Sequence, residues 1–306
     1  MILCVCPNPS IDMRVHLEDF AAGDVNRVMR EERFPGGKGV HVALALAELG
    51  EPTELLGFWG GPTGAWIRAA CEERGISCIG PQVAGWTRTC LTFKCSGPAN
   101  ETELLGCGPG IASEDYHRFK AELRSRLGEA RGLCFSGSWP PGASGNEYAE
   151  LIALANEAGV RTFLDTSGDA LRQCLASRPY GIHVNRSEAA AVSGVAEPAA
   201  AARALAESCE VACVTGGAAG AWFCMGNRGV HAVCRLDAVP SAVGSGDCLL
   251  AGMALGAIRG LDLAEMARLA VACASANCLD PRLGMLRKPD VELLRPRVLI
   301  RECDPA

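Results

Sequence analysis

The sequence predicts an α/β protein in which helices cover both faces of a doubly wound, mostly parallel sheet, with a small β-sheet lid added to it. Short, nearly continuous apolar runs alternate with helical patterns along most of the 306 residues, which is typical of strands buried on both sides in a parallel sheet. One segment instead alternates with a period of two, which indicates a half-exposed strand. We expect residues 1–306 to form a single domain.

Six apolar runs are predicted as strands of the main sheet. They lie at residues 2–6 (ILCVC), 53–59 (TELLGFW), 132–138 (GLCFSGS), 161–167 (RTFLDTS), 181–185 (GIHVN) and 211–216 (VACVTG). Helical patterns lie between them: one over 113–128 has Ser113 as its expected N-cap, another ends at Gly50, and the alanine-rich segment 196–206 is a third. This order of strands and helices predicts βαβ units.

Two regions do not fit the βαβ scheme and are predicted to form the lid. Residues 12–34 carry many charges without a clear helix pattern, and residues 86–96 (WTRTCLTFKCS) place Arg88, Cys90, Thr92 and Lys94 on one, more polar side of an antiparallel strand. We expect a lid from about 12–34 and 86–106, lying over the main sheet. Because an uncovered sheet tends to find a partner, a homodimer through the lid is also expected.

Composition excludes several classes of function. The formal net charge of −6 argues against general nucleic-acid binding, which needs a basic balance. The opening MILCVCPNPS has no basic segment and no run is long enough to span a membrane, so neither a signal peptide nor a membrane partner is expected. The 17 cysteines include no C-x-x-C pair, which favours reduced thiols in a cytoplasmic protein, and no zinc-type spacing occurs.

Four glycine-containing turns are the candidate functional segments. They are FPGGKGVHVALA (34–45), FSGSWPPG (135–142), VTGGAAGAW (214–222) and SAVGSGDCLL (241–250). Each of the first three is either an ordinary turn or a place where a ligand approaches the backbone at a helix start or a strand end. The third lacks the G-x-G start of a dinucleotide fingerprint, so a Rossmann site is not expected there.

The fourth turn places a carboxylate, Asp247, directly after Gly244, Ser245 and Gly246. Leu249 stands where a G-x-G-x-x-G motif needs its last glycine, and no P-loop lysine follows. What remains is a cluster of backbone N–H groups at a helix start, which can stabilise negative charge. From these residues alone, Asp247 is either a residue favoured by the positive helix end or a general base beside an anion hole.

Taken in order, the motifs NPSID, GGKG, SGSWPPG, LDTSG, the N-x-x-E of Asn185 and Glu188, and VGSGD resemble the PfkB (ribokinase-like) carbohydrate kinases. The resemblance runs from about residue 2 to 290 and is strongest to the 1-phosphofructokinase and tagatose-6-phosphate kinase branch. It implies a ribokinase-like fold with a lid and, with Mg²⁺, transfer of the ATP γ-phosphoryl group to a sugar or sugar-phosphate hydroxyl. Fructose 1-phosphate is the leading acceptor, with tagatose 6-phosphate next. The alternatives are an unphosphorylated sugar or nucleoside and a non-catalytic sugar-phosphate sensor.

The resemblance also assigns roles to residues of this chain. Asp247 is the expected base, with Gly244, Ser245 and Gly246 in the anion hole. The residues expected to bind the acceptor are Asp12, Gly36, Gly37, Lys38 and His41 at the sugar and Arg27, Arg88 and Ser136 at its phosphate. The residues expected at the donor are Asn185 and Glu188, which place Mg²⁺ and the ATP phosphates, and Thr215, Gly217, Gly220 and Asn277, which bind the nucleotide.

Four residues depart from the family pattern. His41 and Cys90 stand where the family commonly has Asn, His183 replaces a Lys, and Cys248 replaces the Ser that usually follows the catalytic Asp. Replacing an amide by a thiol or an imidazole changes the donors and acceptors offered to a ligand. These departures therefore bear on the identity of the acceptor sugar rather than on the kinase chemistry.

Overall fold

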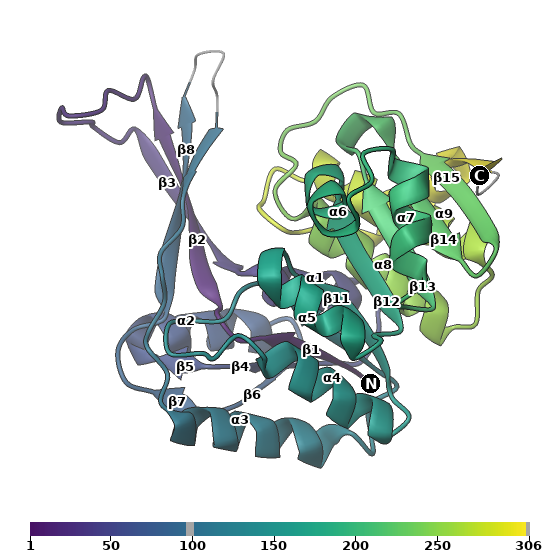
Figure 1. Cartoon of the computed structure of the whole chain (residues 1–306). Helices are drawn as coiled ribbons and strands as arrows, with labels where there is room; N and C mark the ends of the chain where they lie inside the picture. Colours follow the sequence, from purple (N-terminus) through teal and green to yellow (C-terminus); the bar gives the residue numbers. More distant parts are fainter. Residues whose placement is uncertain (96–100, 304–306) are drawn as a thin grey trace.

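The computed structural model describes residues 1–95 and 101–303, and its centre is a 10-stranded sheet in the order β16-β15-β14-β13-β12-β11-β10-β1-β4-β6 (Figure 1). The strands from β13 to β6 in this order are parallel, whereas β14, β15 and β16 are antiparallel. Their bounds are β1 Ile2–Cys6, β4 Thr53–Gly57, β6 Ser77–Ile79, β10 Gly132–Ser136, β11 Arg161–Asp165, β12 Gly181–Asn185, β13 Val211–Thr215, β14 Ala221–Met225, β15 Arg228–Val233 and β16 Leu299–Cys303.

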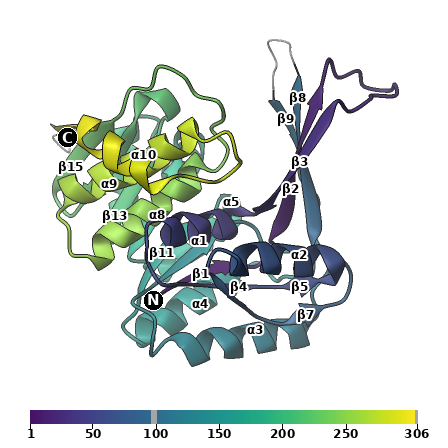
Figure 2. The same ribbon diagram turned by 180° about the vertical axis from the view of Figure 1, so that it is seen from behind.

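Helices cover both faces of this sheet, as the sequence predicts (Figures 1 and 2). One face carries α1 Lys38–Glu48, α2 Gly61–Glu72, α8 Ser245–Ile258, α9 Leu263–Leu279 and α10 Lys288–Leu294, and the other carries α3 Ser113–Arg126, α4 Glu147–Glu157, α5 Gly168–Ala176, α6 Arg186–Ser193 and α7 Pro198–Ala206. Two 3₁₀ turns lie at Gly217–Ala219 and Arg295–Arg297. In β1, Cys4 packs into the core on one face and Leu3 and Val5 into the core on the other, which explains why the strand is apolar throughout.

The predicted lid is a four-stranded sheet in the order β3-β2-β8-β9 that rises from the edge of the main body (Figure 2). Its strands are β2 Ser10–Leu17, β3 Arg30–Gly36, β8 Arg88–Cys95 and β9 Glu101–Leu104, and the part of the expected lid at 96–100 falls outside the described residues. β8 runs parallel to β2 and antiparallel to β9, so the expectation of an antiparallel strand holds for one of its two edges.

Several local predictions need correction. The run at 53–59 is β4 followed by a separate short strand, β5 Trp59–Gly60, which pairs with β7 Gln82–Val83. Ser113 is the first helical residue of α3 rather than its N-cap; Ala112 holds that position, and its amide donates to the Asp115 carboxylate. The antiparallel strands β14 to β16 were not predicted. In the part of the chain that the structure describes, none of the helices has the length and apolarity needed to cross a bilayer.

Candidate functional site

A cavity of about 740 Å³ lies between the lid and the carboxyl ends of the central strands. This edge is where open α/β sheets bind ligands. The residues predicted for the site that line it are Asp12, Gly37, Lys38, His41, Arg88, Gly244 and Asp247. Loops after β10 and β11 add Gly137, Ser138 and Thr166. The structure therefore brings the first, second and fourth glycine turns together around one space, with lid residues opposite.

Asp247 lies in the first turn of α8 and is buried at the cavity wall. The helix begins after Gly244, whose left-handed backbone (φ +84°) lets the chain pass within contact of Gly284; a Cβ there would lie 2.4 Å from the Gly284 Cα. The Ser245 amide donates to the Ala242 carbonyl (3.1 Å), whereas the Gly246 and Asp247 amides follow in the turn where a helix supplies no carbonyl partner. These amides and the helix dipole favour negative charge beside Asp247.

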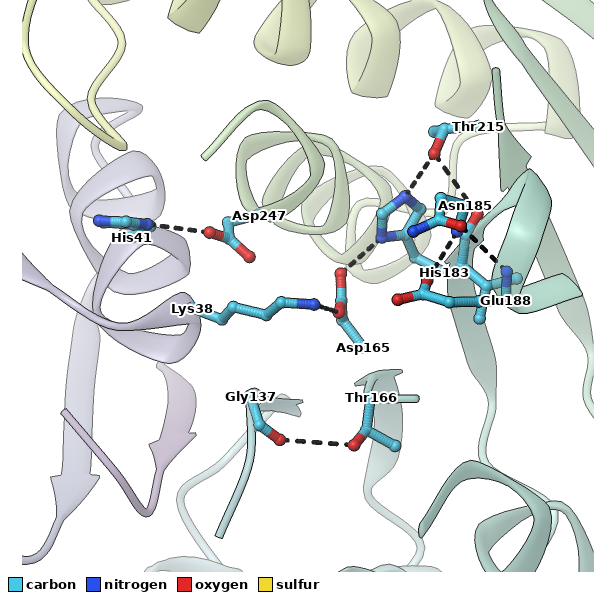
Figure 3. Close-up of polar contacts among 11 residues, drawn as sticks. Lys38, His41, Gly137, Asp165, Thr166, His183, Asn185, Glu188, Thr215 and Asp247 are labelled. Atoms are coloured by element: carbon cyan, nitrogen blue, oxygen red, sulfur yellow. Dashed lines mark hydrogen bonds and ion pairs between the residues drawn. The ribbon is translucent and has the colours of Figure 1, made fainter. Parts of the chain in front are cut away.

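The Asp247 carboxylate contacts the imidazole of His41, which comes from α1 (Figure 3). His41 Nδ1 lies 2.9 Å from Asp247 Oδ2. His41 Nε2 lies 3.2 Å from Oδ2 of Asp12 on β2. Ser10 Oγ donates to the other Asp12 oxygen at 2.6 Å. Gly36, expected to bind the sugar, lies directly against the Asp12 carboxylate; a Cβ there would fall 2.1 Å from Asp12 Cγ, so this glycine leaves room for that carboxylate.

These contacts decide the charges. Burial disfavours a charged imidazole, but the contacts with Asp12 and Asp247 outweigh it and raise the pKa of His41 to about 10. Burial also acts against the Asp12 carboxylate, yet its contacts with His41 and Ser10 leave the pKa of Asp12 lowered. For Asp247, burial is the largest influence and raises the pKa of the carboxyl, which His41 partly opposes. A raised carboxyl pKa is what a general base at neutral pH requires.

A second chain of polar contacts crosses the floor of the site (Figure 3). Lys38 Nζ lies 2.6 Å from Asp165 Oδ1, His183 Nδ1 lies 2.6 Å from Asp165 Oδ2, and His183 Nε2 lies 3.2 Å from Thr215 Oγ1. Burial opposes the charge of Asp165, but Lys38 and then His183 lower the pKa of its carboxyl below the ordinary range. Asp165 was not among the residues predicted for the site. Its signal was available, because it is the polar residue at the carboxyl end of a buried strand, in LDTSG.

Asn185 and Glu188 form a capping box at the start of α6. The Glu188 amide donates to Asn185 Oδ1 (3.0 Å), and the Asn185 amide donates to Glu188 Oε2 (2.9 Å). Among the residues described, no group of three or more His, Cys, Asp and Glu side chains is placed to hold a metal directly. A carboxylate and an amide oxygen nevertheless match the oxygen ligands of Mg²⁺, which keeps several waters and is bound through one or two carboxylates plus phosphate.

The other residues expected to bind the nucleotide lie outside the lining of the cavity. Thr215 ends β13, Gly217 begins the 3₁₀ turn that follows it, and Gly220 comes directly after that turn. Asn277 is buried in α9, where its Nδ2 donates to the Met285 carbonyl (2.8 Å). His183 therefore connects this region, through Thr215, to the Asp165 contacts of the cavity.

Three lid and turn residues are placed differently from the expectation. Arg27 is exposed in the loop between β2 and β3 and lies outside the lining of the cavity, and Ser136 is fully buried while the neighbouring Ser138 lines it. Arg88 was expected on an exposed strand face, but that face points into the cavity. Its guanidinium donates to the carbonyls of Gly106 (3.0 Å) and Asn8 (2.9 Å).

Of the four departures, His41 and Cys90 line the cavity, His183 packs against the turn at Gly246, and Cys248 is buried in the core. An added Cβ at Gly246 would lie 2.9 Å from His183 Cε1.

Comparison with known proteins finds matches over most of the chain. Residues 8–285 match the model of the pfkB family carbohydrate kinases. The chain is 30% identical over 306 residues to the 1-phosphofructokinase of Bacillus subtilis (98% of this chain, 99% of that protein) and 32% identical over 294 residues to the tagatose-6-phosphate kinase of Staphylococcus epidermidis (93% and 94%). The structure superposes on phosphofructokinase-2 of Escherichia coli in complex with substrates and products with a TM-score of 0.89 at 24% identity, covering 96% of this chain and 98% of that one.

Proposed function

The chain belongs to the pfkB family of carbohydrate kinases, and from this premise we propose that it phosphorylates a hydroxyl of a sugar phosphate, most favourably fructose 1-phosphate to give fructose 1,6-bisphosphate. The observation that carries the proposal is the position of Asp247, a buried carboxylate with a raised pKa, at the start of α8 on the wall of the cavity. Tagatose 6-phosphate is the second candidate acceptor, because a kinase of that sugar is 32% identical over 93% of this chain.

In the proposed reaction, Asp247 accepts the proton of the acceptor hydroxyl while that oxygen forms a bond to the γ-phosphorus of ATP. The bond between this phosphorus and the β–γ bridging oxygen breaks, and ADP leaves. The amides of Gly246 and Asp247 stabilise the charge on the transferring phosphoryl group, and Lys38 adds a positive charge nearby. Asp12 accepts hydrogen bonds from sugar hydroxyls, and Arg88 faces the acceptor from the lid.

Kinases of this family use ATP as the phosphoryl donor, and we propose that Thr215, Gly217, Gly220 and Asn277 bind it. Asn185 and Glu188 would hold Mg²⁺ through water and phosphate, and the ion would neutralise phosphate charge. Burial lowers the pKa of Lys38, but three carboxylates raise it above its ordinary value. Asp165 and Asp247 contribute most, and Glu188 contributes less. A residue proposed to hold Mg²⁺, Glu188, therefore interacts electrostatically with Lys38 of the acceptor site.

We further propose a homodimer through the lid and a cytoplasmic location. The loop between β2 and β3 exposes Val25, Val28 and Met29, of which Val25 keeps 82% of its surface accessible. Apolar side chains gathered on one loop favour a protein partner. Free thiols are typical of a reducing compartment, and fractionation of cells would check the location.

The test of the proposed function is ADP release with fructose 1-phosphate, tagatose 6-phosphate, free hexoses and nucleosides, compared between the wild type and Asp247→Asn. We expect the highest kcat/KM with fructose 1-phosphate and a loss of kcat of roughly 10²–10⁴-fold in Asp247→Asn with little change in ATP affinity. Asp169→Asn, an exposed position on α5, is the matched control. Turnover of Asp247→Asn within tenfold of the wild type would exclude this residue as the base, and no ADP release with any acceptor would favour a sensor.

A further inference from the structure

His41 is held between two carboxylates that come from different parts of the fold. Asp247 on α8 contacts one ring nitrogen at 2.9 Å, and Asp12 on β2 contacts the other at 3.2 Å. All three side chains are buried, with 5%, 13% and 7% of the side-chain surface of His41, Asp12 and Asp247 exposed. The imidazole therefore connects the residue proposed to bind the sugar with the residue proposed to deprotonate it.

The backbone around His41 is shaped to the ring. A Cβ at Gly284 would lie 2.0 Å from His41 Cδ2 and 2.2 Å from His41 Cγ, and Gly284 has φ +64°. A Cβ at Gly244 would lie 3.4 Å from His41 Nδ1. Side chains other than hydrogen at position 284 would occupy the place of the imidazole. The ring is thus confined between the backbone of the turn before α8 and that of the 280–287 segment, and its two nitrogens have defined directions.

The charges that face His41 are known from each element around it. The two direct contacts, Asp12 and Asp247, are both acidic, and Glu103 on β9 interacts electrostatically with both Asp12 and His41. Arg88 on β8 acts on Asp12, whereas Lys38 on α1 and Asp165 on β11 act on Asp247 with opposite signs. Without a cation between them, repulsion between two buried carboxylates at one site raises the pKa of at least one of them and so favours its protonated form.

We propose that His41 is a positioning residue whose imidazolium keeps Asp12 and Asp247 ionised and holds them at a fixed separation around the acceptor hydroxyl. This inference rests on the proposed kinase function. His41 Nδ1–H donates to one Asp247 oxygen, so that the carboxylate is oriented and its other oxygen serves the acceptor. An asparagine, as in the family pattern, offers an amide of similar reach but no charge. In this chain the His41 imidazole carries the positive charge and also contacts both Asp12 and Asp247.

The kinetic test is the pH profile of kcat between pH 5.5 and 9 for the wild type, His41→Asn and the control His117→Asn, which changes an exposed histidine of α3. Removing the imidazolium removes an influence that lowers the pKa of Asp247, so the acidic limb of the profile must move to higher pH. We expect His41→Asn to lose kcat roughly tenfold for each pH unit below its displaced limb and to recover at pH 9, with the KM for ATP unchanged. The wild type and His117→Asn are expected to share one profile, with its acidic limb at lower pH than that of His41→Asn.

A merely structural role gives a different result. If His41→Asn loses the same fraction of kcat at every pH, or if its acidic limb coincides with that of the wild type, the proposal is overturned. His41→Gln serves as the second variant if His41→Asn fails to fold. Its longer side chain fills more of the space that the imidazole occupies between Gly244 and Gly284, and it is equally uncharged. The same displacement of the limb is expected for it.

An independent readout needs no turnover. In the NMR spectrum of the ligand-free protein, the imidazole signal that disappears in His41→Asn is expected to keep its imidazolium shift from pH 6 to 9. A signal that moves through pH 7 overturns the proposal whether or not the enzyme is active. A signal that stays charged, together with no ADP release from any acceptor, overturns the proposed function and leaves the charged His41 in place. The two failures are therefore distinguishable.

Discussion

Replacement of Asp165 by Asn is a stringent test of how the floor of the site is held together. The carboxylate lies at the end of β11 and is 3% exposed. It contacts Lys38 Nζ and His183 Nδ1, each at 2.6 Å. An amide of the same size keeps the packing but removes the negative charge between two nitrogen donors. The change therefore isolates the electrostatic contribution of this carboxylate.

The structure sets the size of the expected effect. Removing one partner of a buried ion pair typically costs about 3–5 kcal/mol of unfolding free energy. The Lys38 side chain keeps 44% of its surface exposed, so solvent screens it, and the Asn oxygen still accepts one hydrogen bond. We therefore expect a loss near the lower end, about 3 kcal/mol, measured by urea unfolding at pH 7. kcat should fall as well, because Lys38 loses its fixed partner beside Asp247.

The matched control is Asp169→Asn, which breaks a 2.9 Å contact with Arg172 on the surface of α5, where Asp169 keeps 89% of its side chain exposed. A surface pair of this kind contributes about 0–1 kcal/mol. If Asp165→Asn costs no more than Asp169→Asn, the reasoning from burial is refuted. The pH dependence gives a second check. The folded-state pKa of Asp165 is lowered, so its stabilisation is present above the unfolded value, about 3.9, and the difference between wild type and Asp165→Asn must shrink as the pH falls below that.

Two further predictions follow from backbone contacts and from the lid. Gly284→Ala places a methyl group 2.0 Å from His41 Cδ2 at a left-handed residue, and we expect a loss of about 2–4 kcal/mol in urea unfolding with a larger fall in kcat than in its control. The control is Gly260→Ala, with φ +71° and no atom within 4 Å of the added Cβ; equal losses in the two variants would contradict the contact with His41. For the lid, sizing in solution should give a dimer for the wild type and a monomer for the double variant Val28→Glu and Met29→Glu, whereas Leu293→Glu, an exposed change on α10, should stay dimeric. A wild-type monomer at micromolar concentration, or a dimeric double variant, would exclude the lid as the interface.

Local sequence predicted most of the parallel strands of the main sheet and the glycine turns that line part of the site. Runs such as ILCVC must be buried on both faces, and glycine turns ahead of helices offer amides to a ligand. The segments of Lys38, Gly244 and Asp247 were therefore candidates from local sequence, and the family resemblance assigned their roles. The antiparallel strands β14 to β16 escaped prediction because short half-buried strands give a weaker periodic signal than the apolar runs of the parallel part. Ser113 was misplaced by one residue, since the backbone of Ala112 is capped from Asp115 instead.

Only the tertiary structure decided which of these residues touch. His41 and Asp247 are 206 positions apart, and Lys38 and Asp165 are 127 apart, yet each pair is in contact because the sheet order places the ends of β1, β10 and β11 beside α1 and α8. The charge of His41 likewise depends on burial between two carboxylates, which no local pattern contains. The sequence by itself therefore determined the fold class and the residue that carries the proposed chemistry, Asp247. The contacts that set the protonation of Asp247 come from segments far apart in the sequence. Only the tertiary structure could decide them, because electrostatic interactions depend on distance in space and not on distance along the chain.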